Sequence, residues 1–130
     1  MKRISLALLV LTAASLLPAV ETATSYRLIY AGGSIPNLKV GTETNLFIEN
    51  SRVVLMNGAD MAVAIPATAI NGINYSFDGS RHYVGITWDD SGKRGGFSAQ
   101  VDKNEYRGIV AGLEGVSGKQ AVSSDIRTRQ

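Results

Sequence analysis

Beyond residue 25, apolar and polar residues alternate in short runs, which is the pattern of half-buried β-strands. In the run 82–89, for example, the even-numbered residues from His82 to Trp88 share one face. Turn-forming pairs such as Asn57-Gly58 and Asp78-Gly79 separate the runs. The pattern predicts seven strands, at residues 26–31, 44–49, 52–57, 61–65, 69–77, 82–89 and 96–101.

The run 69–77 changes its side-chain phase once. Ile70 is out of phase with Ile73 and Tyr75 if the strand is regular. One extra residue at Asn71-Gly72 would bring all of them to the same face, so the pattern predicts a β-bulge there. A turn at Asn71-Gly72 is the alternative.

One stretch near the C-terminus has helical periodicity and predicts an amphipathic helix over residues 103–114. Asp102 and Glu105 have the spacing of a capping box, and Gly115 is a natural C-terminal cap. The apolar stripe of this helix consists of Tyr106, Ile109, Val110 and Leu113.

Two glycines lie inside this helix. Gly108 and Gly112 each destabilise a helix by roughly 1 kcal/mol relative to Ala. Their presence in a short helix suggests that its backbone approaches the sheet closely, and tolerated glycines without such a role are the alternative.

The first 23 residues have the features of a secretory signal. Lys2 and Arg3 precede an apolar run at residues 4–17. That run is shorter than the roughly 20 apolar residues that span a membrane. We therefore expect cleavage near Ala23, with Ala19 as the alternative site and an uncleaved anchor as the competing interpretation. The expected division of the chain is a leader at 1–23, one domain at 24–120 and a flexible tail at 121–130. We expect the protein to be exported to the periplasm or the cell exterior.

Composition narrows the class of protein. The chain has 130 residues and no cysteine, so one domain must be held together by its core without disulfides. Removing the leader takes two of the 13 basic residues and one of the 11 acidic residues, which leaves a formal charge of +1. This balance argues against nucleic-acid binding.

The order of seven strands followed by one amphipathic helix resembles the pleckstrin-homology-like superfold. The segment AVAIPATAINGINYS, residues 62–76, looks like the corresponding stretch of small bacterial members and of GRAM-type domains. The resemblance covers residues 25–119 and implies a mainly β fold. Its expected form is a small seven-stranded antiparallel barrel, or two near-orthogonal sheets, closed by one C-terminal α-helix. A different β-sandwich with a terminal helix and a lipocalin-type barrel remain alternatives.

The resemblance implies a binding scaffold without enzymatic activity or cofactor. We expect a protein or peptide partner that adds a strand in a groove between the fifth strand and the helix. The alternative is a small amphipathic ligand or lipid headgroup in the barrel mouth. Membrane contact is only weakly indicated, and a monomer is assumed. The candidate contact residues are Lys39, Lys93, Arg94, Tyr75 and Tyr106.

Catalytic and metal-binding patterns are weak. Ser80 and His82 are triad residue types, but they lie two residues apart and lack a glycine-rich nucleophile elbow. His82 is the only histidine, and we expect it at the margin of the core. The residues 89–92 resemble half of a calcium loop without its terminal bidentate carboxylate, so no metal site is predicted.

Overall fold

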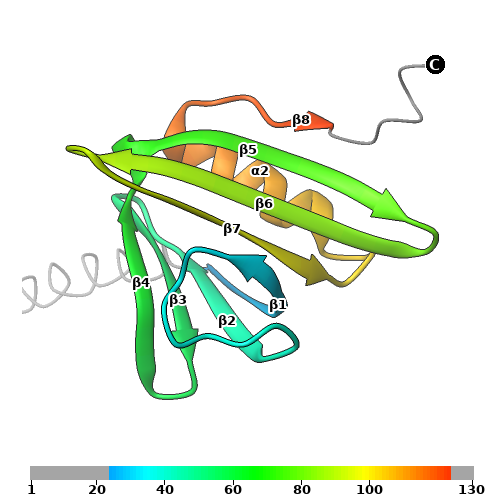
Figure 1. Ribbon diagram of the computed structural model, residues 1–130. Coiled ribbons are helices and arrows are strands. Elements are labelled where there is room, and N and C mark those ends of the chain that lie inside the picture. Colours follow the sequence, from blue (N-terminus) through cyan, green and yellow to red (C-terminus); the bar gives the residue numbers. More distant parts are fainter. Residues whose placement is uncertain (1–23, 124–130) are drawn as a thin grey trace, which may run out of the picture.

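The computed structural model describes residues 24–123 and shows a mainly β domain with one α-helix near its C-terminal end (Figure 1). All seven predicted strands are present, several of them longer than expected, and an eighth short strand follows the helix. The elements are β1 (Thr24–Gly33), β2 (Glu43–Ile48), β3 (Arg52–Asn57), β4 (Asp60–Pro66), η2 (Ala67–Ala69), β5 (Ile70–Asp78), β6 (Arg81–Asp90), β7 (Lys93–Val101), α2 (Tyr106–Ser117) and β8 (Val122–Ser123).

The strands form one sheet in the order β4-β3-β2-β1-β7-β6-β5-β8. Strand β1 joins the two halves, because its first part pairs with β2 and its second part with β7. In Figure 1 strands β3 and β4 run at a steep angle to the long strands β5–β7. The expectation of a closed barrel is wrong, since β4 and β8 are the two edges of the sheet. The expectation of a wholly antiparallel sheet also fails at β8, which pairs parallel with β5.

The predicted bulge in β5 is confirmed. The register between β5 and β6 shifts between Ile70 and Gly72. The hydroxyl of Thr87 donates a hydrogen bond of 2.8 Å to the side-chain oxygen of Asn71 at this point. As a result Ile70 and Ile73 are both buried on the core face despite their different phases in the sequence.

The helix begins later and ends later than the sequence predicts. Residues 102–105 form a turn in which the Asp102 carbonyl accepts from the amides of Glu105 and Tyr106. The Asp102 carboxylate accepts from the Asn104 amide at 2.7 Å, so it stabilises this turn instead of capping the helix. The helix then ends at Ser117, and Gly118, with φ 75°, is the left-handed cap that was expected at Gly115.

The helix covers the inner face of the sheet. Ile109 and Leu113 have no exposed surface. An added Cβ at Gly108 would lie 3.1 Å from the Tyr26 hydroxyl, and one at Gly112 would lie 3.1 Å from Cδ1 of Ile48. The helix backbone therefore lies close to β1 and β2, as the two glycines suggested. The strand residues buried in the same core include Leu28, Tyr30, Leu46, Val53, Leu55, Ile65, Ile70, Val84, Ile86 and Ala99.

The segment after the helix turns back along it. The amide of Lys119 donates to the Ser117 hydroxyl at 3.1 Å, and the amide of Ala121 donates to Oε2 of Glu114 at 2.7 Å. Val122–Ser123 then forms β8 beside β5, so the prediction of a flexible tail from residue 121 is wrong for these residues. The predicted leader at 1–23 and the remainder of the predicted tail lie outside the described residues.

Candidate functional site

A groove of about 350 Å³ lies between α2 and β5, the strand next to the edge strand β8. The helix supplies one wall through residues one turn apart, and β5 and the segment before β8 supply the rest. A partner strand was predicted to bind in a groove at this place. Its lining consists of Tyr75, Tyr106, Arg107, Val110, Ala111, Glu114 and Ala121.

Two of the five predicted contact residues meet at this groove. The rings of Tyr75 on β5 and Tyr106 on α2 have centroids 6.4 Å apart. Phe77 lies edge-on to Tyr106 at 5.6 Å, which extends the aromatic surface along β5. Large amphipathic aromatic side chains at a groove are typical of the central residues of protein interfaces.

His82 belongs to the same aromatic cluster. Its ring stacks on Tyr106 with centroids 4.6 Å apart and meets Phe77 edge-on at 4.7 Å. Nδ1 of His82 is buried and has no hydrogen-bond partner in the described part of the chain. The residue thus packs at the margin of the core, as predicted, and holds the first turn of α2 against the β5–β6 hairpin.

Charged side chains stand on the helix side of the groove. The Arg107 guanidinium lies 5.7 Å from the Tyr106 ring centroid. The hydrogen bond from Nε of Arg107 to the Tyr106 hydroxyl raises the pKa of Arg107 above its usual value. On the same side, Glu114 accepts the amide of Ala121 and thereby positions the chain that leads into β8.

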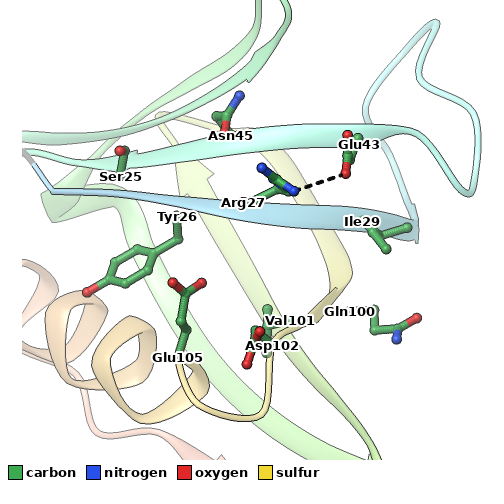
Figure 2. A pocket seen from close by; sticks show the side chains of 10 residues that line it. All are labelled: Ser25, Tyr26, Arg27, Ile29, Glu43, Asn45, Gln100, Val101, Asp102 and Glu105. Atoms are coloured by element: carbon green, nitrogen blue, oxygen red, sulfur yellow. Dashed lines mark ion pairs between the residues drawn. The ribbon is translucent and has the colours of Figure 1, made fainter.

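A second, larger cleft of about 500 Å³ lies where β1 and β7 diverge (Figure 2). The pairing of β1 with β7 begins at Ile29 and Gln100, so the earlier residues of β1 pair only with β2. In Figure 2 the Glu105 carboxylate points from the start of α2 toward this space. Arg27 and Glu43 form an ion pair of 3.7 Å whose side chains are 72% and 64% exposed, a geometry that contributes little stability.

Two of the predicted contact residues, Lys93 and Arg94, belong to the β6–β7 hairpin. They do not line either of these two clefts. Lys93 and Arg94 lie at the start of β7 and not in a loop, because the turn before it consists only of residues 91–92. They face Asp90 and Asp89 across the ladder, and Nε of Arg94 is 3.3 Å from Oδ2 of Asp89. Arg94 is therefore already paired within its own hairpin.

Lys39 is exposed in the loop between β1 and β2. A third cleft of about 310 Å³ lies between this loop and the turn from β3 to β4. Lys39 does not belong to its lining, which consists of Pro36, Asn37, Leu38, Asn57, Asp60, Met61 and Ala62. The structure therefore does not bring Lys39 together with Lys93 and Arg94 in one of these clefts.

Sequence reasoning missed the helix residues that complete the groove. Arg107, Ala111 and Glu114 recur at intervals of four and three residues, so they form a second stripe beside the apolar one. The same periodicity that identified the buried face could have identified this neighbouring face. Nothing in the local sequence indicated that Ala121 would lie beside it.

Between residues 24 and 123 there is no group of three or more His, Cys, Asp or Glu side chains placed to hold a metal ion. Within the same range, the helix falls short of the length and apolar character that crossing a membrane requires.

Comparison with known proteins gives similarity in fold alone. No family model matches the sequence, and no curated protein matches it. Among solved structures, the chain is similar to the Spt16D–Pob3N heterodimer, with a TM-score of 0.60 and 10% identity over 80% of this chain and 55% of that chain. The C-terminal phosphotyrosine interaction domain of APBB2 from mouse has a TM-score of 0.56 and 11% identity over 75% of this chain and 87% of that one. A synaptonemal complex protein has a TM-score of 0.51 and 12% identity over 76% and 28%. These likenesses show a PH-like fold in broad terms.

Proposed function

We propose that this domain is a binding module that takes an extended segment of a protein partner into the groove between β5 and α2. The observation that carries the proposal is the position of the groove. It lies beside an edge of the sheet and carries Tyr75, Tyr106 and Val110 on its walls. A sheet edge offers backbone hydrogen bonds to an added strand, and adjacent pockets select its side chains.

The similar structures support a binding role. One is a phosphotyrosine interaction domain and another is part of a heterodimer. At 10–11% identity they support the class of function and not a particular partner. The partner chemistry must therefore come from this chain's own groove.

The alternative of a small ligand in a barrel mouth has less support. The sheet is open and not a closed barrel, so there is no mouth of the expected kind among the described strands. Ile109 and Leu113 fill the space beneath the helix with fully buried side chains. The groove outside the helix is the better candidate.

Export is part of the proposal. The leader-like residues 1–23 motivate it, with Lys2 and Arg3 before a short apolar run. N-terminal sequencing of the exported product should find a chain that starts after Ala23. A product in the membrane fraction that still begins at Met1 would overturn this part.

The binding proposal is tested by filling the groove without disturbing the core. Ala111 is exposed and lines the groove, so Ala111→Trp should block it. Gly115 lies one turn further along α2, does not belong to the lining, and has open space where a side chain would start. Gly115→Trp is therefore a matched control. Each protein, tagged after Gln130, is used to capture partners from its native envelope extract.

We expect a protein that is retained by the parent and by Gly115→Trp and is lost with Ala111→Trp. Urea unfolding of the three proteins checks that each is folded. Equal retention of the same partner by Ala111→Trp would show that the groove is not the binding site. Co-purification of lipid in place of protein would favour the alternative ligand class.

A further inference from the structure

The edge of β5 in this groove already carries an extended segment, and that segment belongs to the same chain. Asn74 and Tyr75 pair in parallel with Val122 and Ser123. Figure 1 shows β8 lying along the outer side of β5, after the chain has turned back from the end of α2. The remaining residues of β5 have no partner strand on this side within residues 24–123.

We propose that residues 119–123 act as an internal ligand of the β5 edge beside the β5–α2 groove, and that a partner enters parallel to β5 and displaces them. This inference rests on the proposed function because it concerns the same groove. It adds the direction of the bound segment, the kind of segment and a means by which the site is regulated.

The direction follows from the contacts of the internal segment. Glu114 fixes its beginning, since Oε2 accepts the Ala121 amide at 2.7 Å. One residue later the chain reaches Asn74 and runs toward Tyr75. A segment that enters in the same direction keeps both the bond to Glu114 and the parallel pairing with β5. An antiparallel segment would place a different backbone group opposite Glu114.

The kind of segment follows from the residues of the internal segment itself. Ala121 forms part of the wall of the groove, so a small side chain lies at this position beside β5. Val122 and Ser123 follow with extended geometry, and a β-branched residue favours that geometry. The β5 edge therefore fits an extended peptide with a small residue followed by a β-branched and a hydroxyl-bearing residue.

The internal segment is suited to displacement. β8 has only two residues, and Val122 keeps 63% of its surface exposed. Burial of so little apolar surface contributes little to its hold on the sheet. A short tether nevertheless keeps the segment at a high local concentration, so it competes with partners in solution. If about one molecule in ten is open, the apparent affinity of a partner falls about tenfold.

The test uses the full-length exported protein and a labelled synthetic peptide, KQAVSSDIRTRQ, which copies residues 119–130. In one variant, Val122→Pro and Ser123→Pro are combined. Consecutive strand residues direct their amides to opposite sides, so this pair removes whichever amide faces β5. The control combines Val122→Thr and Ser123→Thr, which keeps both amides and the extended preference. A scrambled peptide of the same composition is the specificity control.

We expect the proline variant to bind the peptide at least about tenfold more tightly than the parent and the threonine control. A spin label on the peptide N-terminus should broaden the amide signals of Gly72 and Ile73, as parallel entry requires. Equal affinity for all three proteins, or no binding to the proline variant, would overturn the internal-ligand proposal. Broadening at Ser76–Asp78 instead would overturn the parallel direction. A captured partner that is lost with Ala111→Trp would keep the proposed function valid in each of these cases.

Discussion

Three glycines of α2 have different surroundings, and the difference determines what a side chain would do at each position. Gly108 and Gly112 face Tyr26 and Ile48, with 3.1 Å left between an added Cβ and the nearest atom. That distance is shorter than an ordinary van der Waals contact. Gly115 has nothing within 4 Å. Of these three glycines, only Gly115 lowers the stability of the helix at a position where no neighbouring atom excludes a side chain.

We predict that Gly115→Ala raises the free energy of unfolding by about 0.5–1 kcal/mol, which is the usual difference between Gly and Ala inside a helix. Gly112→Ala should gain less, because Ile48 is buried and must move to admit the new methyl group. Urea unfolding of both variants beside the parent measures the difference. An equal gain at the two positions would show that the helix does not approach β2 as closely as described.

At the scale of the element, α2 holds the two halves of the sheet through its buried stripe. Leu113→Ala should lower the free energy of unfolding by about 2–5 kcal/mol, since Leu113 has no exposed surface. Asp102→Ala should cost less than the value of about 1 kcal/mol typical of a lost helix cap. Its carboxylate supports only an exposed turn ahead of the helix. The midpoints of urea unfolding of Leu113→Ala and Asp102→Ala, measured beside the parent, test both predictions. An unchanged midpoint for Leu113→Ala would mean that the helix is not part of the core.

The elements differ in how far their sequence determined them. The strands and the bulge at Asn71-Gly72 follow from alternation and its single change of phase, which are local patterns. The start of α2 does not, because a carboxylate at Asp102 can support a turn as well as a helix N-terminus. β8 has no local signal at all. It depends on Asn74 and Val122, which are far apart in the sequence.

The candidate site, too, could be predicted from the sequence only in part. Tyr75 and Tyr106 were predicted as contact residues of a groove between the fifth strand and the helix, and their rings lie 6.4 Å apart at that groove. Alternation assigns residues to faces but does not say which strands are neighbours. For this reason the open sheet and the occupied edge of β5 could not be predicted. The place of Ala121 in the groove follows from that edge.

At the scale of the whole molecule, the sheet has a protected centre and a weakly held margin. β1 and β7 lie in the middle of the strand order, and Ala99 of β7 is almost completely buried. β8 is the outermost strand. Amides at the centre of such a sheet exchange with solvent only when the domain unfolds, whereas marginal segments open locally at lower free energy.

Hydrogen exchange of the Ala99 and Ala121 amides should distinguish unfolding of the whole domain from local opening at β8. Leu46→Ala removes a buried side chain of β2 and should cost about 2–5 kcal/mol, so the Ala99 amide should exchange roughly 30-fold faster or more. The Ala121 amide, bonded to Glu114, should keep its parent rate because the segment before β8 opens without unfolding the core. If Ala121 accelerates together with Ala99, β8 opens only when the whole domain unfolds. A partner could then not displace it from the folded protein, and the internal-ligand proposal would fail.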